Sequence, residues 1–213
     1  MRAADLRLYL VLDPDQSARS GGLIETALAA VRGGVTMIQL RAPRWKKREF
    51  VEAARALRSA LMPFSVPLLI DDHADVALVA EADGLHIGQD DLSVEDARRL
   101  LGPDRIIGLS AGNPEELRSA DPALVDYYGV GPVFATMSKA DAGDAIGTEG
   151  LAEVVRLAAH PCVAIGGIGA ANADQVAATG AAGIAVISAI CGQPDPEASA
   201  RALLNRFNSG IRQ

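Results

Sequence analysis

Two acidic pairs follow short apolar runs of this sequence. Asp71 and Asp72 come directly after one run, and Asp90 and Asp91 come after a second run and a glycine-containing turn. Carboxylates from neighbouring strand ends can converge on one Mg²⁺, a hard cation that is often shared with a diphosphate. We therefore predict that Asp72 and Asp91 hold Mg²⁺. The alternative is that Asp90 and Asp91 cap a helix near Ser93, while Asp71 and Asp72 are solvated.

An arginine follows an earlier apolar run. Segment 36–40 contains one polar residue near its end, Gln39, and Arg41 comes next. A guanidinium in this place suits bidentate binding of phosphate or carboxylate. The alternative is a loop arginine whose charge is simply solvated.

A long connection follows the run Tyr127–Val130. It extends from Gly131 to about Gly150 and carries the hydroxyls of Thr136 and Ser138. Its length and its glycines predict a loop that closes over a substrate. The alternative is a merely flexible insertion.

Glycines and a serine follow the last two apolar runs. Gly166, Gly167 and Gly169 come after the first of them, and Ser188 comes after the second. Barrels commonly bind a phosphate here, through backbone amides of the two loops and the start of a short helix. Glycine lets the backbone approach the anion closely. The alternative is that these glycines serve tight turns only.

Eight aliphatic runs alternate with segments of helical periodicity. The expected strands are Leu8–Leu12, 36–40, 67–70, Gly84–Ile87, 106–109, Tyr127–Val130, Cys162–Ile165 and 183–187, and the expected helices include 23–31, 50–61, Val94–Leu101, 151–158, 173–178 and 196–207, with Ser93 and Asn113 at helix starts. The alternation predicts a parallel sheet buried on both faces. Eight units in 213 residues favour a (β/α)8 TIM barrel over a Rossmann or flavodoxin-like sheet. The groups described above then lie at the carboxyl ends of the strands.

The composition excludes several classes of protein. Apolar residues make up 49% of the chain and charged residues 22%, which is typical of a globular protein, and we expect one domain over residues 1–213. The net charge of -7 comes without a basic block, so we expect neither nucleic acid nor a membrane as partner. A homo-oligomer stays open.

The remaining reactive side chains are expected to be structural. Cys162 and Cys191 lie in apolar contexts without metal-ligand spacing, which indicates buried thiols in a reducing compartment, the cytoplasm. His86 lies among apolar neighbours, and we expect a satisfied core histidine there.

The sequence resembles the thiamine phosphate synthase family along essentially its whole length. The matching blocks are 39–41, Asp72, 84–91, 108–110, 129–134, Thr136, Lys139, 165–168 and 186–190. The resemblance implies a transferase that joins a pyrimidine diphosphate to a thiazole phosphate with Mg²⁺ and releases pyrophosphate. It assigns Mg²⁺ to Asp72 and Asp91, and catalysis to Arg41, Ser110 and Lys139. The substrate-binding residues that it implies are Gln39, Leu40, Arg41, Ala42, Pro43, Asp71, Ser110, Thr136, Met137, Ser138, Lys139, Gly167, Ile187 and Ser188.

The sequence departs from the family pattern in three places. Ala42 and Pro43 stand where a glutamate and a lysine are usual, Asp71 stands where asparagine is usual, and Ser138 keeps the hydroxyl of a usual threonine. Lys46 or Lys47 is the candidate to supply the missing cation. These departures leave two alternatives: a thiazole tautomerase-like relative, which retention of the metal and lysine positions disfavours, and a non-catalytic relative that only binds thiazole phosphate.

Overall fold

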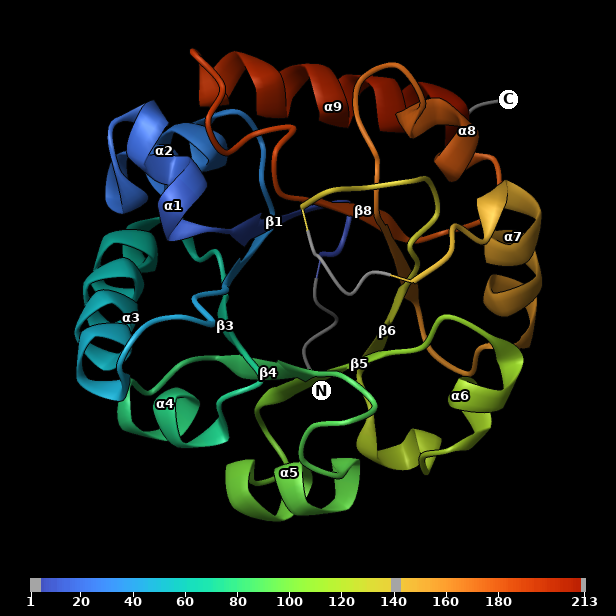
Figure 1. Cartoon of the computed structure of the whole chain (residues 1–213), viewed down its shortest axis with the longest axis horizontal. Helices are drawn as coiled ribbons and strands as arrows, with labels where there is room; N and C mark the ends of the chain where they lie inside the picture. Colours follow the sequence, from blue (N-terminus) through green and yellow to red (C-terminus); the bar gives the residue numbers. More distant parts are fainter. Residues whose placement is uncertain (1–4, 139–142, 212–213) are drawn as a thin grey trace.

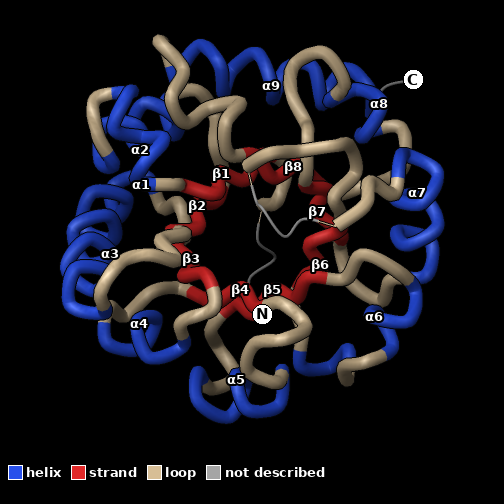
Figure 2. Tube along the Cα trace, in the orientation of Figure 1, coloured by secondary structure: helices blue, strands red, loops and turns tan. Residues whose placement is uncertain are grey.

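Eight parallel strands close into a barrel, and helices surround it on all sides (Figures 1 and 2). The computed structural model describes residues 5–138 and 143–211. The strands are β1 Leu8–Leu12, β2 Met37–Leu40, β3 Leu68–Asp71, β4 Gly84–Ile87, β5 Ile106–Ser110, β6 Tyr127–Val130, β7 Cys162–Ile165 and β8 Gly183–Val186. Each strand pairs with the next, and β8 returns to β1. The predicted (β/α)8 barrel is confirmed.

The helices form the outer ring. They are α1 Pro14–Ser17, α2 Leu23–Arg32, α3 Lys47–Leu61, α4 Ala74–Val79, α5 Val94–Leu101, α6 Pro114–Arg118, α7 Gly147–Leu157, α8 Ala173–Ala177 and α9 Pro196–Ile211, with 3-10 turns η1 Ala18–Ser20, η2 Met62–Phe64 and η3 Pro122–Leu124. In the view down the barrel, α9 lies between α8 and α2 outside β8 and β1 (Figure 1). Within the described part of the chain, no helix is both long and apolar enough to span a membrane.

The strands are buried on both faces, which explains their nearly continuous aliphatic composition. All five residues of β1 are buried, and Leu10 is the register partner of Ile38 on β2 and Val186 on β8. Successive side chains alternate between the barrel interior and the helices. On β6 this alternation directs Tyr127 into the barrel and Tyr128 outward, toward His160.

Side-chain caps set several helix starts. Ser93 Oγ accepts from Asp96 N at 3.1 Å and begins α5, and Asn113 Oδ1 caps α6 in the same way. The alternative in which Asp90 and Asp91 cap α5 is therefore wrong. Asp13 caps α1, a short helix that the sequence pattern does not single out.

Some boundaries differ from those expected. β2 begins at Met37, one residue later than expected, and Thr36 just before it donates both its N–H and its hydroxyl to Leu8 O, at 2.9 and 3.0 Å. β8 ends at Val186 because Ile187 O accepts from Cys191 N and begins a turn. α3 and α7 each begin earlier than the apolar periodicity indicates, since their first turns carry few apolar residues.

An arginine network closes the end of the barrel at which the strands begin. Arg98 Nη2 lies 2.8 Å from Asp126 Oδ2 and also donates to Leu124 O, while Nη1 donates to Arg105 O at 2.7 Å. The same Asp126 oxygen accepts from Ile107 N at 2.8 Å. Both partners of the ion pair are largely buried. The network stabilises the end of the barrel opposite the candidate site.

Candidate active site

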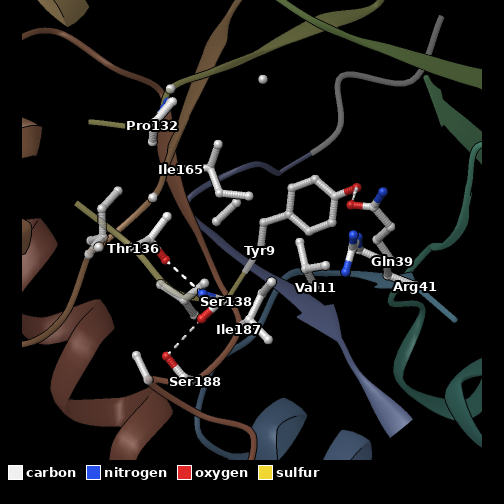
Figure 3. A pocket seen from close by; sticks show the side chains of 18 of the residues that line it. Tyr9, Val11, Gln39, Arg41, Pro132, Thr136, Ser138, Ile165, Ile187 and Ser188 are labelled. Atoms are coloured by element: carbon white, nitrogen blue, oxygen red, sulfur yellow. Dashed lines mark hydrogen bonds between the residues drawn. The ribbon is translucent and has the colours of Figure 1, made fainter. Parts of the chain in front are cut away.

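A cavity of about 1070 Å³ opens at the carboxyl ends of the strands. Figure 3 shows residues that line it, and they fall into two groups. Tyr9, Gln39 and Arg41 come from β1 and β2 on one side, and Thr136 and Ser188 come from the loops after β6 and β8 on the other. The two sides differ in chemistry. The first carries charged and aromatic polar groups, and the second carries hydroxyls, glycines and aliphatic side chains.

Arg41 and Gln39 both contact Asp71 on the first side. Arg41 Nε lies 3.3 Å from Asp71 Oδ2, and Gln39 Nε2 donates to Asp71 Oδ1. The side chains of Arg41 and Asp71 are 17% and 13% exposed, so the carboxylate is not solvated as one alternative supposed. A guanidinium has five N–H donors, so pairing through Nε is compatible with binding a phosphate as well.

Hydrogen bonds continue from Gln39 across the cavity. Tyr9 Oη donates to Gln39 Oε1 at 3.1 Å and lies 3.0 Å from Tyr127 Oη. Tyr127 Oη lies 2.8 Å from His86 Nδ1, and His86 Nε2 lies 3.0 Å from Ser110 Oγ. Both ring nitrogens of His86 thus have partners, as expected of a satisfied histidine. The residue lines the cavity, however, and is not part of the apolar core.

Burial and neighbouring groups keep the two phenols protonated. Burial is the main cause that raises the pKa of Tyr9 and of Tyr127 above the ordinary tyrosine value, and the charge of Asp71 acts in the same direction on both. Each hydroxyl therefore has one hydrogen to donate.

Glycine at position 108 makes room for these side chains. A Cβ there would lie 2.3 Å from Tyr127 Oη and 2.5 Å from His86 Nδ1. No side chain fits at that distance, so the glycine of β5 is required by the packing of β4 and β6 side chains inside the barrel.

The second side brings together the predicted phosphate-binding residues. Ser138 Oγ donates to Ser188 Oγ at 3.3 Å, and Ser138 N donates to Thr136 Oγ1 at 3.2 Å (Figure 3). Gly167 has a φ of 63°, and a Cβ on it would lie 2.6 Å from Ala135 O. Ile187, also in the lining, is buried. The loops after β6, β7 and β8 therefore meet around one space.

A smaller cavity of about 320 Å³ adjoins the first. Ala42 and Pro43 line it, while Met137 and Ser138 line both cavities. Leu40 is fully buried and belongs to the apolar core. Of the predicted substrate-binding residues in the described chain, Leu40 is thus the one that lines neither of these two cavities.

The two predicted metal ligands follow adjacent strands at the carboxyl end of the barrel, and neither is among the residues that line the two cavities. Asp72 follows β3, and its N–H donates to His86 O on β4 at 2.9 Å. Its φ of 58° is unusual for a residue with a side chain, and such backbone strain concentrates at functional sites. Asp91 follows β4 and accepts from Gly88 N at 2.8 Å. No cluster of three metal-ligating side chains exists among residues 5–138 and 143–211. Two carboxylates still fit Mg²⁺, which is often held by one or two carboxylates and substrate phosphates.

Lys47, one candidate for the cation that the family pattern has near position 43, contacts two other side chains. Its Nζ lies 2.8 Å from Asp75 Oδ1 and 2.8 Å from His73 Nδ1. The pKa of His73 lies below the ordinary histidine value because burial and the Lys47 charge lower it by more than the charges of Asp75 and Asp91 raise it. Lys47 is therefore a member of a rim cluster beside the predicted metal site.

Sequence reasoning did not assign Tyr9 and Tyr127 to the site. Lys139, which it did assign, lies outside the described residues. The signal for the tyrosines was their inward position on β1 and β6, combined with glycines at Gly108 and Gly129 that leave space for large neighbours.

Comparison with known proteins identifies the family of this chain. The family model "Thiamine monophosphate synthase" matches residues 8–190. A "Thiamine-phosphate synthase" of Xanthobacter autotrophicus is 53% identical over 199 residues, which cover 93% of this chain and 94% of that protein. A solved thiamine phosphate pyrophosphorylase from Pyrococcus furiosus superposes with a TM-score of 0.88 at 35% identity and covers 98% of each chain.

A more distant structure shares the fold alone. The 3-hexulose-6-phosphate synthase of Salmonella typhimurium has a TM-score of 0.72 at 19% identity, covering 96% of this chain and 100% of that one. The match to the family model extends from β1 to the turn after β8 and includes every strand of the barrel. The chain belongs to the thiamine monophosphate synthase family of transferases.

Proposed function

We propose that this enzyme condenses 4-amino-2-methyl-5-(diphosphooxymethyl)pyrimidine with 4-methyl-5-(2-phosphooxyethyl)thiazole, giving thiamine phosphate and pyrophosphate. The observation that carries the proposal is one cavity with two chemically different sides. Small-molecule sites measure roughly 300–1000 Å³. At about 1070 Å³ this cavity lies at the upper end of that range, which is compatible with two small ligands. Both partners in the proposal are small molecules.

The first side suits the pyrimidine diphosphate. A diphosphate that leaves gains negative charge as its C–O bond breaks, and the Arg41 guanidinium can stabilise that charge. Asp72 and Asp91 would hold Mg²⁺, which neutralises charge on the leaving group. The family resemblance adds Lys139 and Ser110 to this substrate.

The proposed substitution is dissociative. The C–O bond breaks first, the aminopyrimidine stabilises the resulting carbocation, and the thiazole nitrogen captures it. The attacking nitrogen carries a lone pair and no proton, so no protein base is required for this step.

The second side suits the phosphate of the thiazole. The hydroxyls of Thr136, Ser138 and Ser188 can donate to phosphate oxygens, and the turn at Gly167 lets backbone approach the anion. Aliphatic neighbours such as Ile187 suit the thiazole ring.

One assay tests the reaction. The purified protein is incubated with both substrates and Mg²⁺, and thiamine phosphate and pyrophosphate are measured. We expect both products in equal amounts and none after chelation of the metal. If neither product forms while a control synthase is active, the chain binds thiazole phosphate without turnover or has tautomerase-like chemistry, and the proposal is wrong.

Paired substitutions test the metal site. Asp91→Ala should reduce turnover strongly, with only a modest loss of thiazole phosphate binding. Asp90→Ala is the matched control, because this neighbouring carboxylate is exposed and is not a proposed ligand. Equal turnover in the two variants would contradict a metal role for Asp91.

A further inference from the structure

A continuous line of hydrogen bonds crosses the barrel from β3 to β5. Its first half passes from Asp71 through Gln39 to Tyr9. Its second half passes from Tyr9 through Tyr127 and His86 to Ser110. Each member can be a donor, an acceptor or both, so the hydrogen positions along the line depend on one another. Which atom donates and which accepts in each bond, that is, the direction of donation along the line, is determined at the Asp71 end.

Asp71 determines the orientation of the Gln39 amide. A carboxylate only accepts hydrogen bonds, and Arg41 Nε lies beside its second oxygen at 3.3 Å. Gln39 must therefore present its NH₂ group to Asp71, because the opposite orientation would place two oxygens against each other. Its carbonyl oxygen is left for the Tyr9 hydroxyl, 3.1 Å away.

The two tyrosines transmit this direction. Tyr9 has one hydroxyl hydrogen and donates it to Gln39 Oε1, so its oxygen must accept in the bond of 3.0 Å to Tyr127. Tyr127 then gives its only hydrogen to Tyr9. Its oxygen is left as an acceptor for His86 Nδ1, which lies 2.8 Å away.

The direction ends at a residue that lines the cavity. A neutral imidazole has one donor and one acceptor nitrogen. When Nδ1–H of His86 donates to Tyr127, Nε2 is the acceptor, and the Ser110 hydroxyl at 3.0 Å must donate to it. The Ser110 oxygen then presents only lone pairs to the cavity.

We propose that Asp71, Gln39, Tyr9 and Tyr127 act as positioning residues that hold His86 in its Nδ1–H tautomer and make Ser110 a hydrogen-bond acceptor for the substrate. Phosphate oxygens carry lone pairs and would be repelled there. An N–H group fits, and the amino group of the proposed aminopyrimidine supplies one. The proposed contact between Ser110 and the amino group rests on the proposed function, whereas the proposed tautomer of His86 does not.

The tautomer is measurable without substrate. Nitrogen-15 NMR of the histidine-labelled protein at alkaline pH separates protonated from unprotonated ring nitrogens. The chain has three histidines, so the variants His73→Gln and His160→Gln identify the His86 signals by elimination. We expect Nδ1 protonated and Nε2 unprotonated. The reverse tautomer, or protonation of both nitrogens, would overturn the proposal.

Two variants test the source of the direction. Tyr127→Phe removes the acceptor for Nδ1–H, and Asp71→Asn allows the amide pair to reverse. We expect each to convert the single His86 tautomer into a mixture. An unchanged tautomer in both variants, with the wild-type spectrum elsewhere, would show that the line of bonds does not determine it.

Ligand binding tests the role of Ser110. The probes are 4-amino-5-hydroxymethyl-2-methylpyrimidine, the same compound without its amino group, and pyrophosphate with Mg²⁺. Ser110→Ala should weaken binding of the aminopyrimidine by roughly 2- to 12-fold, the range for one neutral hydrogen bond. It should leave the other two probes unchanged. Ser59→Ala, on the exposed outer side of α3, is the control.

The opposite pattern would refute the acceptor role. If Ser110→Ala weakened pyrophosphate binding and not aminopyrimidine binding, the hydroxyl would be a donor to phosphate. If the wild-type protein bound neither pyrimidine, the proposed contact between Ser110 and the amino group would fail, whereas the proposed function is decided separately by formation of thiamine phosphate and pyrophosphate. The tautomer of His86 would still be decided by the NMR measurement.

Discussion

Replacing Tyr127 with phenylalanine removes one oxygen from the middle of the buried polar line. That oxygen lies 3.0 Å from Tyr9 Oη and 2.8 Å from His86 Nδ1, and the tyrosine is 1% exposed. A net hydrogen bond contributes about 0.5–1.5 kcal/mol to stability. Loss of two such bonds predicts a decrease of about 1–3 kcal/mol in the free energy of unfolding.

The next residue on β6 provides a matched control. Tyr128 is equally buried but faces outward and packs its ring against His160. Among the described residues its hydroxyl takes part in no hydrogen bond with another side chain. Tyr128→Phe removes the same atom from the other face of the same strand, and we expect a change within about 0.5 kcal/mol.

Urea unfolding followed by circular dichroism measures both variants. A shift in the midpoint at a constant m-value reports a change in stability. We expect the Tyr127→Phe midpoint to fall clearly below those of the wild type and Tyr128→Phe. Equal shifts in the two variants would refute the reasoning. The Tyr127 hydroxyl, with its two hydrogen-bond partners, would then contribute no more to stability than the Tyr128 hydroxyl.

Two further predictions concern other parts of the barrel. Arg98→Ala leaves the Asp126 carboxylate without its buried cation and should reduce the free energy of unfolding by about 3–5 kcal/mol. The kcat/KM of the folded protein should stay near the wild-type value, because this network lies at the end of the barrel opposite the site. A large loss of kcat/KM at equal folded fraction would contradict that separation. Burial raises the pKa of the Cys162 thiol to about 11, so iodoacetamide at pH 8 should label it only after unfolding. Because the pKa of Cys162 in the folded protein lies above the reference value of 9.0, the contribution of the protonated thiol to stability is complete below about pH 9 and is lost as pH rises toward 11. Rapid labelling of Cys162 in the native protein would contradict the prediction of a protected thiol.

Local patterns predicted the barrel well. Tyr127–Val130 and Val94–Leu101 have the bounds expected from the sequence, because a buried aliphatic run and a capped amphipathic helix are each determined by neighbouring residues. Helix starts without apolar periodicity were predicted less well, as at Lys47 and Gly147. There the first turn is polar, and tertiary packing decides whether it is helical.

A place in the cavity could be predicted where one strand end supplies one group. Arg41, predicted from its position after an apolar run, and Ser110, implied by the family resemblance, both line the cavity at the ends of their strands. The hydrogen bond between Tyr9 and Tyr127 joins residues 118 positions apart. No local pattern reports such a contact, because it depends on closure of the barrel and on space left at Gly108.

Asp71 links the departures in sequence to the arrangement of the site. An additional carboxylate beside a predicted metal site appears unfavourable when the sequence is considered alone, because like charges repel. In the structure, Arg41 and Gln39 contact this carboxylate. An asparagine in the same place can both donate and accept, so it would not force the Gln39 amide into one orientation. On the inference drawn above, the negative charge at this position is what gives the hydrogen bonds from Gln39 to Ser110 a single direction. Restoring the usual asparagine should therefore weaken the discrimination that Ser110 makes between an N–H group and a phosphate oxygen.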